Sequence, residues 1–416
     1  MHRDSEANLK LNPVAVNSQR DKLTAPPGKQ ALPPERDFLL ELENLWRNLP
    51  YLTGSYSVDS SRNLLRGKPA ILVTSGPSLN KNIDLLREIQ KRAIVISCGS
   101  ALAPMYKRGI VPHFEVVSDP YPLMYEKVKL VYQPETCFLM SLTAHYRISQ
   151  IAGLPKMYCL VDFADEVLAD LRKCTQINTV LPVMASVAAT AFSFALHLGA
   201  DPVIFVGQDM CFSGEQSHVD NMDKAVNTCT LEAVDGRVVQ TTPLLKEVFE
   251  YFGNLVPRIK ERKIINATEG GAGIPGAEHI TLAETAARYL SGDLVLPHLP
   301  PYQGDLLKLK NGLEEIDSKF RAINRRITDF HQKITRSTKT AGVKDLSGED
   351  ILDRFNEIKR APGYQYLAAY LDNIRRRVLT SLEPERKFDL FGVTAKCFQE
   401  QLSRIEETLS ILNSFT

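Results

Sequence analysis

Long apolar runs, paired cysteines and an excess of charge of one sign are all missing from this chain of 416 residues. No run of about 18 apolar residues occurs, so we expect no membrane-spanning helix. The 50 basic and 49 acidic residues leave a formal net charge of +1. Because binding a phosphate backbone needs a basic excess, this balance argues against a nucleic acid as partner.

The seven cysteines are scattered singly, and none forms a Cys-x-x-Cys pair. Such pairs are typical of zinc sites, so no metal site is predicted. Cys137 and Cys159 lie inside apolar runs and should be small buried hydrophobic residues. Residues 1–10 are polar and lack the apolar core of a signal peptide. An odd, unpatterned set of thiols is typical of a reducing compartment, so we expect a cytoplasmic protein.

Four regions differ in pattern along the chain. Residues 1–36 are polar and contain several prolines, which predicts a flexible N-terminal arm. Residues 37–66 begin with apolar side chains at helical spacing and predict a helical lead-in. Residues 67–297 alternate short apolar runs with helical stretches, whereas 298–416 are helical in pattern throughout.

Seven short apolar runs in 67–297 predict strands that are buried on both faces. Helical stretches such as 79–92 and 187–198 lie between several of them. This alternation predicts an α/β domain with a Rossmann-like, doubly wound parallel sheet. The predicted strands are 70–74, 94–97, 114–117, 137–140, 157–161, 203–206 and 264–266.

The C-terminal region carries apolar residues at alternating spacings of four and three. Such stripes pack against partner helices, so 298–416 should form a helical bundle or hairpin, with a further helix within 366–382. A structural cap and a protein-docking or oligomerisation module both remain open. The stripes consist of Leu309, Leu313, Ile316, Phe320, Ile323, Ile327, Phe330 and Ile334, and of Phe398, Leu402, Ile405, Leu409 and Leu412.

Ligands of open parallel sheets bind beyond the carboxyl ends of the strands, so the residues that follow each strand are the candidates. The first strand ends in a loop of Ser75, Gly76, Pro77 and Ser78. Glycine allows a close backbone approach, and N–H groups at a helix start suit a phosphate. The loop matches neither Walker A nor GxGxxG. An ordinary junction with Ser78 as helix N-cap is the alternative.

Small and polar residues follow later strands in the same way. Gln208 and Asp209 come directly after an apolar strand and need hydrogen-bond partners if they are buried. A histidine in the polar loop beyond them is a candidate base, although lone loop histidines are usually solvated. The candidates at these exits are Gly99, Ser100, Asp119, Ser186, Gly207, Gln208, Asp209, His218 and Glu269.

Four segments of 67–297 together resemble the motility accessory factor (Maf) family of flagellin glycosyltransferases, which are similar to transferases of CMP-activated nonulosonic acids. The core also resembles 6-hydroxymethylpterin diphosphokinase-like proteins and, more remotely, bacterial CMP-sialic-acid sialyltransferases. The segments are 76–83 (GPSLNKNI), 99–120 (GSALAPMYKRGIVPHFEVVSDP), 185–214 (ASVAATAFSFALHLGADPVIFVGQDMCFSG) and 266–276 (NATEGGAGIPG).

The resemblance implies a role for each segment. The loop 75–78 would hold the nucleotide, and Gly99 and Ser100 would line the sugar side. Asp119, Ser186, Gly207, Gln208 and Glu269 would complete the donor site, and His218 or Asp209 would be the general base. Ala185 stands where related sequences have glycine. The implied acceptor is flagellin, bound through the helical region, and no cofactor is firmly implied beyond the CMP-activated sugar as substrate.

Two other functions remain open. A pterin-type diphosphokinase would need Mg²⁺ to bridge the phosphates of ATP, and its ligands would be Asp119, Asp209 and Glu269. The second of these functions is a flagellin-binding scaffold, in which the sugar-nucleotide fold is kept without activity. The helical region, which a small-molecule kinase does not need, favours the glycosyltransferase.

Overall fold

The structure is a computed structural model that describes residues 34–162, 165–183, 186–212, 228–233, 235–341, 356, 358–360, 364 and 384–414. Most of the predicted arm, Ala185, His218 and the helix expected within 366–382 lie outside the described residues.

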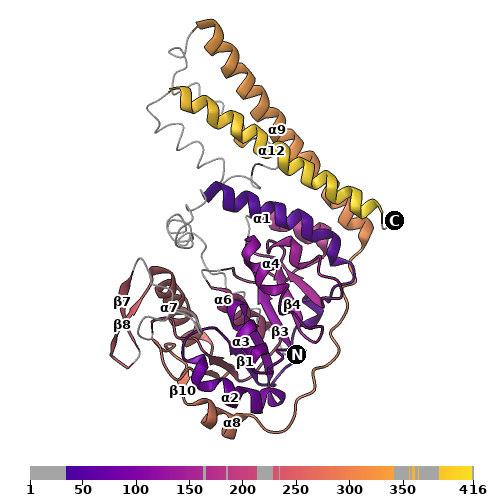
Figure 1. Cartoon of the computed structure of the whole chain (residues 1–416). Helices are drawn as coiled ribbons and strands as arrows, with labels where there is room; N and C mark the ends of the chain where they lie inside the picture. Colours follow the sequence, from indigo (N-terminus) through magenta and orange to yellow (C-terminus); the bar gives the residue numbers. More distant parts are fainter. Residues whose placement is uncertain are drawn as a thin grey trace, which may run out of the picture.

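Eight parallel strands form one sheet in the order β10-β9-β6-β1-β2-β3-β4-β5 (Figure 1). All seven predicted strands are confirmed, because their continuous apolar runs supply side chains for both faces of the sheet. The strands are β1 (Ala70–Val73), β2 (Ile94–Cys98), β3 (Phe114–Val117), β4 (Cys137–Ser141), β5 (Lys156–Cys159), β6 (Val203–Val206), β9 (Ile264–Asn266) and β10 (Glu278–His279).

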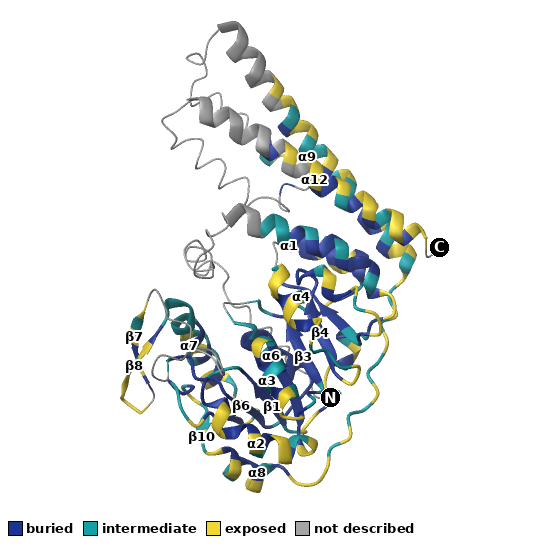
Figure 2. Ribbon diagram, in the orientation of Figure 1, coloured by how far each residue is buried: buried dark blue, intermediate teal, exposed yellow. Residues whose placement is uncertain are grey.

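Helices cover both faces of the sheet, which confirms the doubly wound α/β prediction. One face buries Ile71, Val73 and Val95 against α2, α3 and α8. The other buries Leu72 and Phe205 in a larger core that includes α6 and α7 (Figure 2). The helices are α2 (Leu79–Ile89), α3 (Leu102–Lys107), α4 (Pro122–Val128), α5 (Asp165–Thr175), α6 (Val187–His197), α7 (Pro243–Leu255) and α8 (Leu282–Tyr289).

Three strands were not predicted. The antiparallel pair β7 (Cys229–Glu232) and β8 (Val238–Thr241) lies outside the main sheet. Both are half-exposed, so they lack the continuous apolar run that marks the buried strands. β10 is only two residues long and polar, and its pairing with β9 alone identifies it.

In the described part of the C-terminal region, two long helices run side by side (Figure 1): α9 (Leu306–Ala341) and α12 (Pro384–Asn413). Their apolar stripes are buried as predicted from Leu309 to Ile327 and at Leu402, Ile405 and Leu412, while Leu409 is half-buried. These side chains join the same core cluster as the sheet. None of the described helices combines the length and apolarity needed to cross a membrane.

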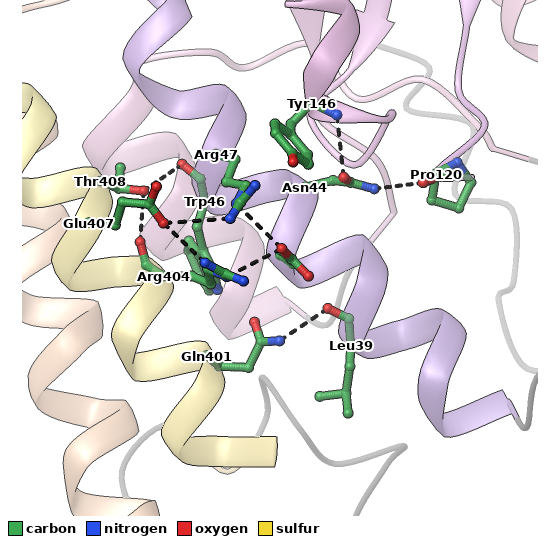
Figure 3. A network of polar contacts seen from close by, with 11 residues as sticks. Leu39, Asn44, Trp46, Arg47, Pro120, Tyr146, Gln401, Arg404, Glu407 and Thr408 are labelled. Atoms are coloured by element: carbon green, nitrogen blue, oxygen red, sulfur yellow. Dashed lines mark hydrogen bonds and ion pairs between the residues drawn. The ribbon is translucent and has the colours of Figure 1, made fainter. Parts of the chain in front are cut away.

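Helix α1 (Pro34–Asn48) lies between the α/β layers and α12 (Figure 3). Toward α12, Arg47 pairs with Glu407, and the Thr408 hydroxyl donates to the Trp46 carbonyl at 3.0 Å. The Trp46 ring also meets Phe320 of α9 edge-on, at 5.6 Å between centroids. The helical region is therefore attached to the α/β layers through α1. It is also attached directly through α5, since Lys319 of α9 pairs with Asp170 at 2.5 Å.

The opposite side of α1 holds the loop that follows β4. The buried Asn48 amide donates to the Leu142 and Ala144 carbonyls, both at 2.8 Å. Its oxygen accepts from the Ser149 hydroxyl at 2.6 Å. One buried side chain of α1 thus satisfies three polar groups of the neighbouring loop.

Replacing Asn48 with alanine should lower the free energy of unfolding by about 2–3 kcal/mol, because buried carbonyls would lose their donors. The measurement is a urea unfolding curve. The matched control is Asn254→Ala on exposed α7 surface, which should change stability by less than about 0.5 kcal/mol. Equal effects of the two substitutions would contradict this role of Asn48.

Candidate functional site

The order of the strands places a switch point between β1 and β6. From β1 the chain builds the sheet outward through β2 to β5, and then crosses to the other side of β1 to add β6. In open parallel sheets, ligands commonly bind beyond the carboxyl ends of the strands at such a switch point. The segments that leave β1 and β6 are the predicted nucleotide loop and the Gly207-Gln208-Asp209 segment.

These two segments are in close backbone contact. The Gly76 amide donates to the Gly207 carbonyl at 2.8 Å. A Cβ atom on Gly76 would lie 2.0 Å from Asp209 Oδ2 and 2.2 Å from the Gly207 oxygen. Gly207 has a φ of +74°, and a Cβ there would lie 2.3 Å from the Thr74 oxygen. Both glycines are therefore required by the close approach.

Ser78 and Asp209 form the polar centre of this contact. Asp209 Oδ2 accepts from the Ser78 hydroxyl at 2.7 Å and from the Ser78 amide at 3.2 Å. Ser78 precedes α2 but makes no capping bond with its side chain, so it is not an ordinary N-cap. Burial raises the pKa of Asp209, and the bonds from Ser78 partly oppose that shift.

The loop that follows β9 packs against the same aspartate. A Cβ on Gly271, whose φ is +74°, would lie 2.4 Å from Asp209 Cα. The Ala272 backbone N–H donates to the Asp209 carbonyl at 2.7 Å, and the Gln208 backbone N–H donates to the Thr268 hydroxyl at 3.0 Å. The exits of β1, β6 and β9 thus form one interlocked unit, which we call the cradle (residues 74–79, 207–210 and 268–272).

Glu269 ties the cradle to the surrounding helices. Its Oε1 accepts from the Asn82 amide at 2.9 Å and from the Leu282 backbone N–H at 3.1 Å. Its carbonyl accepts from Lys81 Nζ at 2.8 Å. Lys81 is exposed and brings a cation to the edge of the cradle, where it partly opposes the rise in the pKa of Asp209 that burial causes.

Most amides at the start of α2 are already used inside the protein. The Ser78 backbone N–H donates to the Asp209 carboxylate. Those of Leu79 and Lys81 donate to the carbonyls of Gly76 and Ser78, respectively. By contrast, neither the amide nor the hydroxyl of half-buried Ser75 has a hydrogen-bond partner among the described residues. The groups that remain for an anion at this exit are therefore Ser75 and the Lys81 ammonium.

The exits of β2 and β3 adjoin the cradle. Gly99 follows β2 with a φ of +56°. The exposed Ser100 hydroxyl accepts from Lys127 Nζ at 3.4 Å. Asp119 follows β3 with an exposed side chain, and its Oδ1 accepts from the Tyr121 amide at 2.9 Å.

Ser186 begins α6 on the opposite face of the sheet from α2. Its hydroxyl accepts from the Ala188 amide at 3.2 Å, so it is the N-cap of that helix. A Cβ on Gly99 would lie 3.5 Å from the Val187 side chain, which places the start of α6 beside the exit of β2.

The structure thus brings the predicted residues together in two adjoining groups. Ser75, Gly76, Pro77, Ser78, Gly207, Gln208, Asp209 and Glu269 belong to the cradle. Gly99, Ser100, Asp119 and Ser186 lie at neighbouring exits. Sequence reasoning missed Lys81 and Lys127. Lys81 stands three residues after Ser78 on a predicted helix, so its spacing could have indicated it.

Two titratable side chains near these exits make no hydrogen bond of standard geometry in the described part of the chain. Glu115 of β3 is fully buried, and burial raises its pKa to about 8. The Ser97 hydroxyl and the Gly99 amide lie near enough to moderate that shift. His145, after β4, is 4% exposed, and burial lowers its pKa. Sequence patterns gave no signal for either residue.

The three carboxylates predicted as Mg²⁺ ligands are engaged separately. Asp209 accepts from Ser78, Glu269 accepts from Asn82 and Leu282, and Asp119 accepts from Tyr121 at another strand exit. Across the described ranges, no three His, Cys, Asp or Glu side chains are grouped closely enough to hold a metal ion.

Comparisons with known proteins agree with this architecture. Residues 43–215 match the family model described as 6-hydroxymethylpterin diphosphokinase MptE-like. No curated protein sequence matches the chain significantly. The solved MAf glycosyltransferase from Magnetospirillum magneticum AMB-1 is similar in structure, with a TM-score of 0.55 and 17% sequence identity. The similarity covers 92% of this chain but 61% of that protein, so the chain spans about three fifths of its length. The resemblance predicted from the sequence is thereby confirmed: residues 43–215 are similar to MptE-like proteins, and the fold is like that of a Maf glycosyltransferase.

Proposed function

We propose that this protein is a glycosyltransferase that moves a nonulosonic acid, of the pseudaminic or legionaminic type, from a CMP-activated donor to Ser or Thr hydroxyls of flagellin. The observation that carries the proposal is the cradle at the switch point between β1 and β6, where α/β proteins bind nucleotides. The fold likeness to a Maf glycosyltransferase supports it. The reaction would take place in the cytoplasm and support flagellar assembly.

The donor would lie across the strand exits. Its CMP phosphate would contact Ser75 and Lys81 beside Gly76, since these groups are available at the cradle. Its sugar would extend toward Gly99, Ser100 and Asp119. Neighbouring strands are about 4.8 Å apart, so β1 and β3 end about 10 Å from each other, roughly the length of a phosphate and one sugar ring.

Replacing Lys81 with methionine should weaken CMP binding about tenfold, because a charge-assisted contact to the phosphate would be lost. Calorimetric titration measures the affinity. Lys107→Met, in the last turn of α3, is the matched control and should bind CMP as the wild type does. Unchanged affinity of the Lys81 variant would exclude this lysine from the phosphate site.

The helical region would present the acceptor. Its two long helices expose mixed charges along α9 and α12, and flagellin is itself rich in helices near its ends. Incubating the full chain with flagellin and CMP-pseudaminic or CMP-legionaminic acid should add one sugar mass per modified hydroxyl, as read by intact-mass spectrometry. Absence of a mass shift with every CMP-nonulosonic acid would overturn the proposal.

A diphosphokinase is the second candidate, because residues 43–215 match a family model of that description. It is less well supported, since the carboxylates Asp209 and Glu269 are occupied by protein donors.

A flagellin-binding scaffold without activity would be favoured if Ser78→Ala and Asp209→Ala left flagellar assembly intact while removal of residues 305–416 abolished it.

A further inference from the structure

Two of the predicted carboxylates at the strand exits, Asp119 and Glu269, are exposed. Glu269 Oε1 accepts two hydrogen bonds, from the Asn82 side chain and the Leu282 backbone N–H. Asp119, at the end of β3, is less engaged. Its Oδ1 accepts from the Tyr121 amide at 2.9 Å, and its Oδ2 has no hydrogen-bond partner among the described residues. Asp209, the predicted base, is only 3% exposed and accepts two hydrogen bonds from Ser78. Asp119 is thus placed to meet a substrate, whereas Asp209 is placed to hold the loop that contains Ser78.

The backbone that carries Asp119 is held from two other elements. The Asp119 carbonyl accepts from the amide of His145, which follows β4, at 3.1 Å. The next carbonyl, of Pro120, accepts from the buried Asn44 side chain of α1 at 3.0 Å. Groups that act on a substrate require such fixed supports, because small displacements cost rate. An exposed carboxylate on a firmly held backbone fits that requirement.

The surroundings of Asp119 adjust its basicity. Although the residue is exposed in part, neighbouring protein atoms crowd its carboxylate, and this loss of hydration raises its pKa. The Tyr121 backbone N–H and the Lys127 ammonium partly oppose the rise. Lys127 also donates to Ser100, so Ser100, Asp119 and Lys127 occupy one part of the edge. A carboxylate with a raised pKa is a better general base near neutral pH.

Building on the proposed function, we propose that Asp119 is the general base of the transfer reaction. The acceptor hydroxyl gives its proton to Asp119 Oδ2 as its oxygen forms a bond to the anomeric carbon of the sugar. The bond between that carbon and the phosphate oxygen breaks, and CMP leaves with the electron pair. Asp119 then releases the proton to solvent. Asp209 serves as a positioning residue that fixes the nucleotide loop through Ser78.

Three variants test the assignment in the full chain, with CMP-pseudaminic acid and flagellin as substrates once the wild type shows transfer. Asp119→Asn should lower kcat at least 100-fold, because general-base catalysis typically contributes that much. Its affinity for CMP should stay within threefold of the wild type. Asp119→Glu keeps a carboxylate and should retain the fall in rate at acidic pH. The control, Asp84→Asn, removes an exposed aspartate paired with Arg108 and should leave the rate unchanged.

A fall in kcat of less than 100-fold for Asp119→Asn would overturn the assignment. An equal loss of CMP affinity would also overturn it, because that would indicate a binding or structural role. If the wild type itself transfers no CMP-nonulosonic acid, the proposed function fails, and this inference fails with it. Transfer by the wild type together with transfer at a similar rate by Asp119→Asn would remove the inference alone.

Discussion

Replacing Gly76 with alanine is expected to abolish CMP binding and to lower the free energy of unfolding by about 3 kcal/mol or more. The added Cβ would lie 2.0 Å from Asp209 Oδ2 and 2.2 Å from the Gly207 oxygen, distances at which atoms must move apart. Because the Gly207 oxygen belongs to the backbone, the nucleotide loop itself would have to shift. Calorimetric titration with CMP and urea unfolding measure the two effects.

The control for this substitution is Gly253→Ala in the interior of α7. There the added Cβ would lie 3.4 Å from the Pro275 ring, which is an ordinary contact. Alanine also favours a helix by up to about 1 kcal/mol over glycine, so this variant should be as stable as the wild type or more so. If Gly76→Ala were equally well tolerated and still bound CMP, the interlocked cradle would be contradicted.

Replacing Glu115 with glutamine should remove a large pH dependence of stability. Burial raises the pKa of Glu115 from its ordinary 4.5 to about 8. Below pH 4.5 both states carry the proton. Between 4.5 and 8 the folded state keeps it while the unfolded state loses it, so stability falls by about 1.4 kcal/mol per pH unit. Glutamine does not titrate, so this loss disappears.

The comparison requires urea unfolding of both proteins at pH 6 and pH 8. The free energy of unfolding of Glu115→Gln, relative to the wild type, should rise by about 2 kcal/mol between these values. Glu88→Gln, at an exposed position of α2, is the control and should show a constant difference. A pH-independent difference for Glu115→Gln as well would show that this carboxyl group titrates normally in the folded state.

The strands and long helices of the fold were predictable because each is marked by a pattern of apolar residues within its own short segment. Each central strand is a short, continuous apolar run such as Ala70–Val73, and each long helix of the C-terminal region repeats apolar residues every three or four positions. These patterns follow from backbone geometry alone. β10 and the β7–β8 pair were missed because their pairing, rather than their composition, defines them.

The sequence could predict which residues lie together in the candidate site, but not which hydrogen bonds they make. Strand exits of a parallel sheet share one edge, so Ser78 and Asp209 could be expected near each other although they are 131 positions apart. That Asp209 would be occupied by Ser78 while Asp119 stays accessible depends on side-chain packing between several elements. The same holds for Glu115, which is buried without a hydrogen bond of standard geometry among the described residues. No sequence spacing reveals that.

Titration of the wild-type chain with CMP and with ATP shows whether the cradle binds a CMP-activated sugar. We expect saturable CMP binding in the presence of EDTA, and weaker ATP binding that Mg²⁺ does not enhance. Tight, Mg²⁺-dependent binding of ATP with no detectable binding of CMP would overturn the proposed donor site and favour the diphosphokinase.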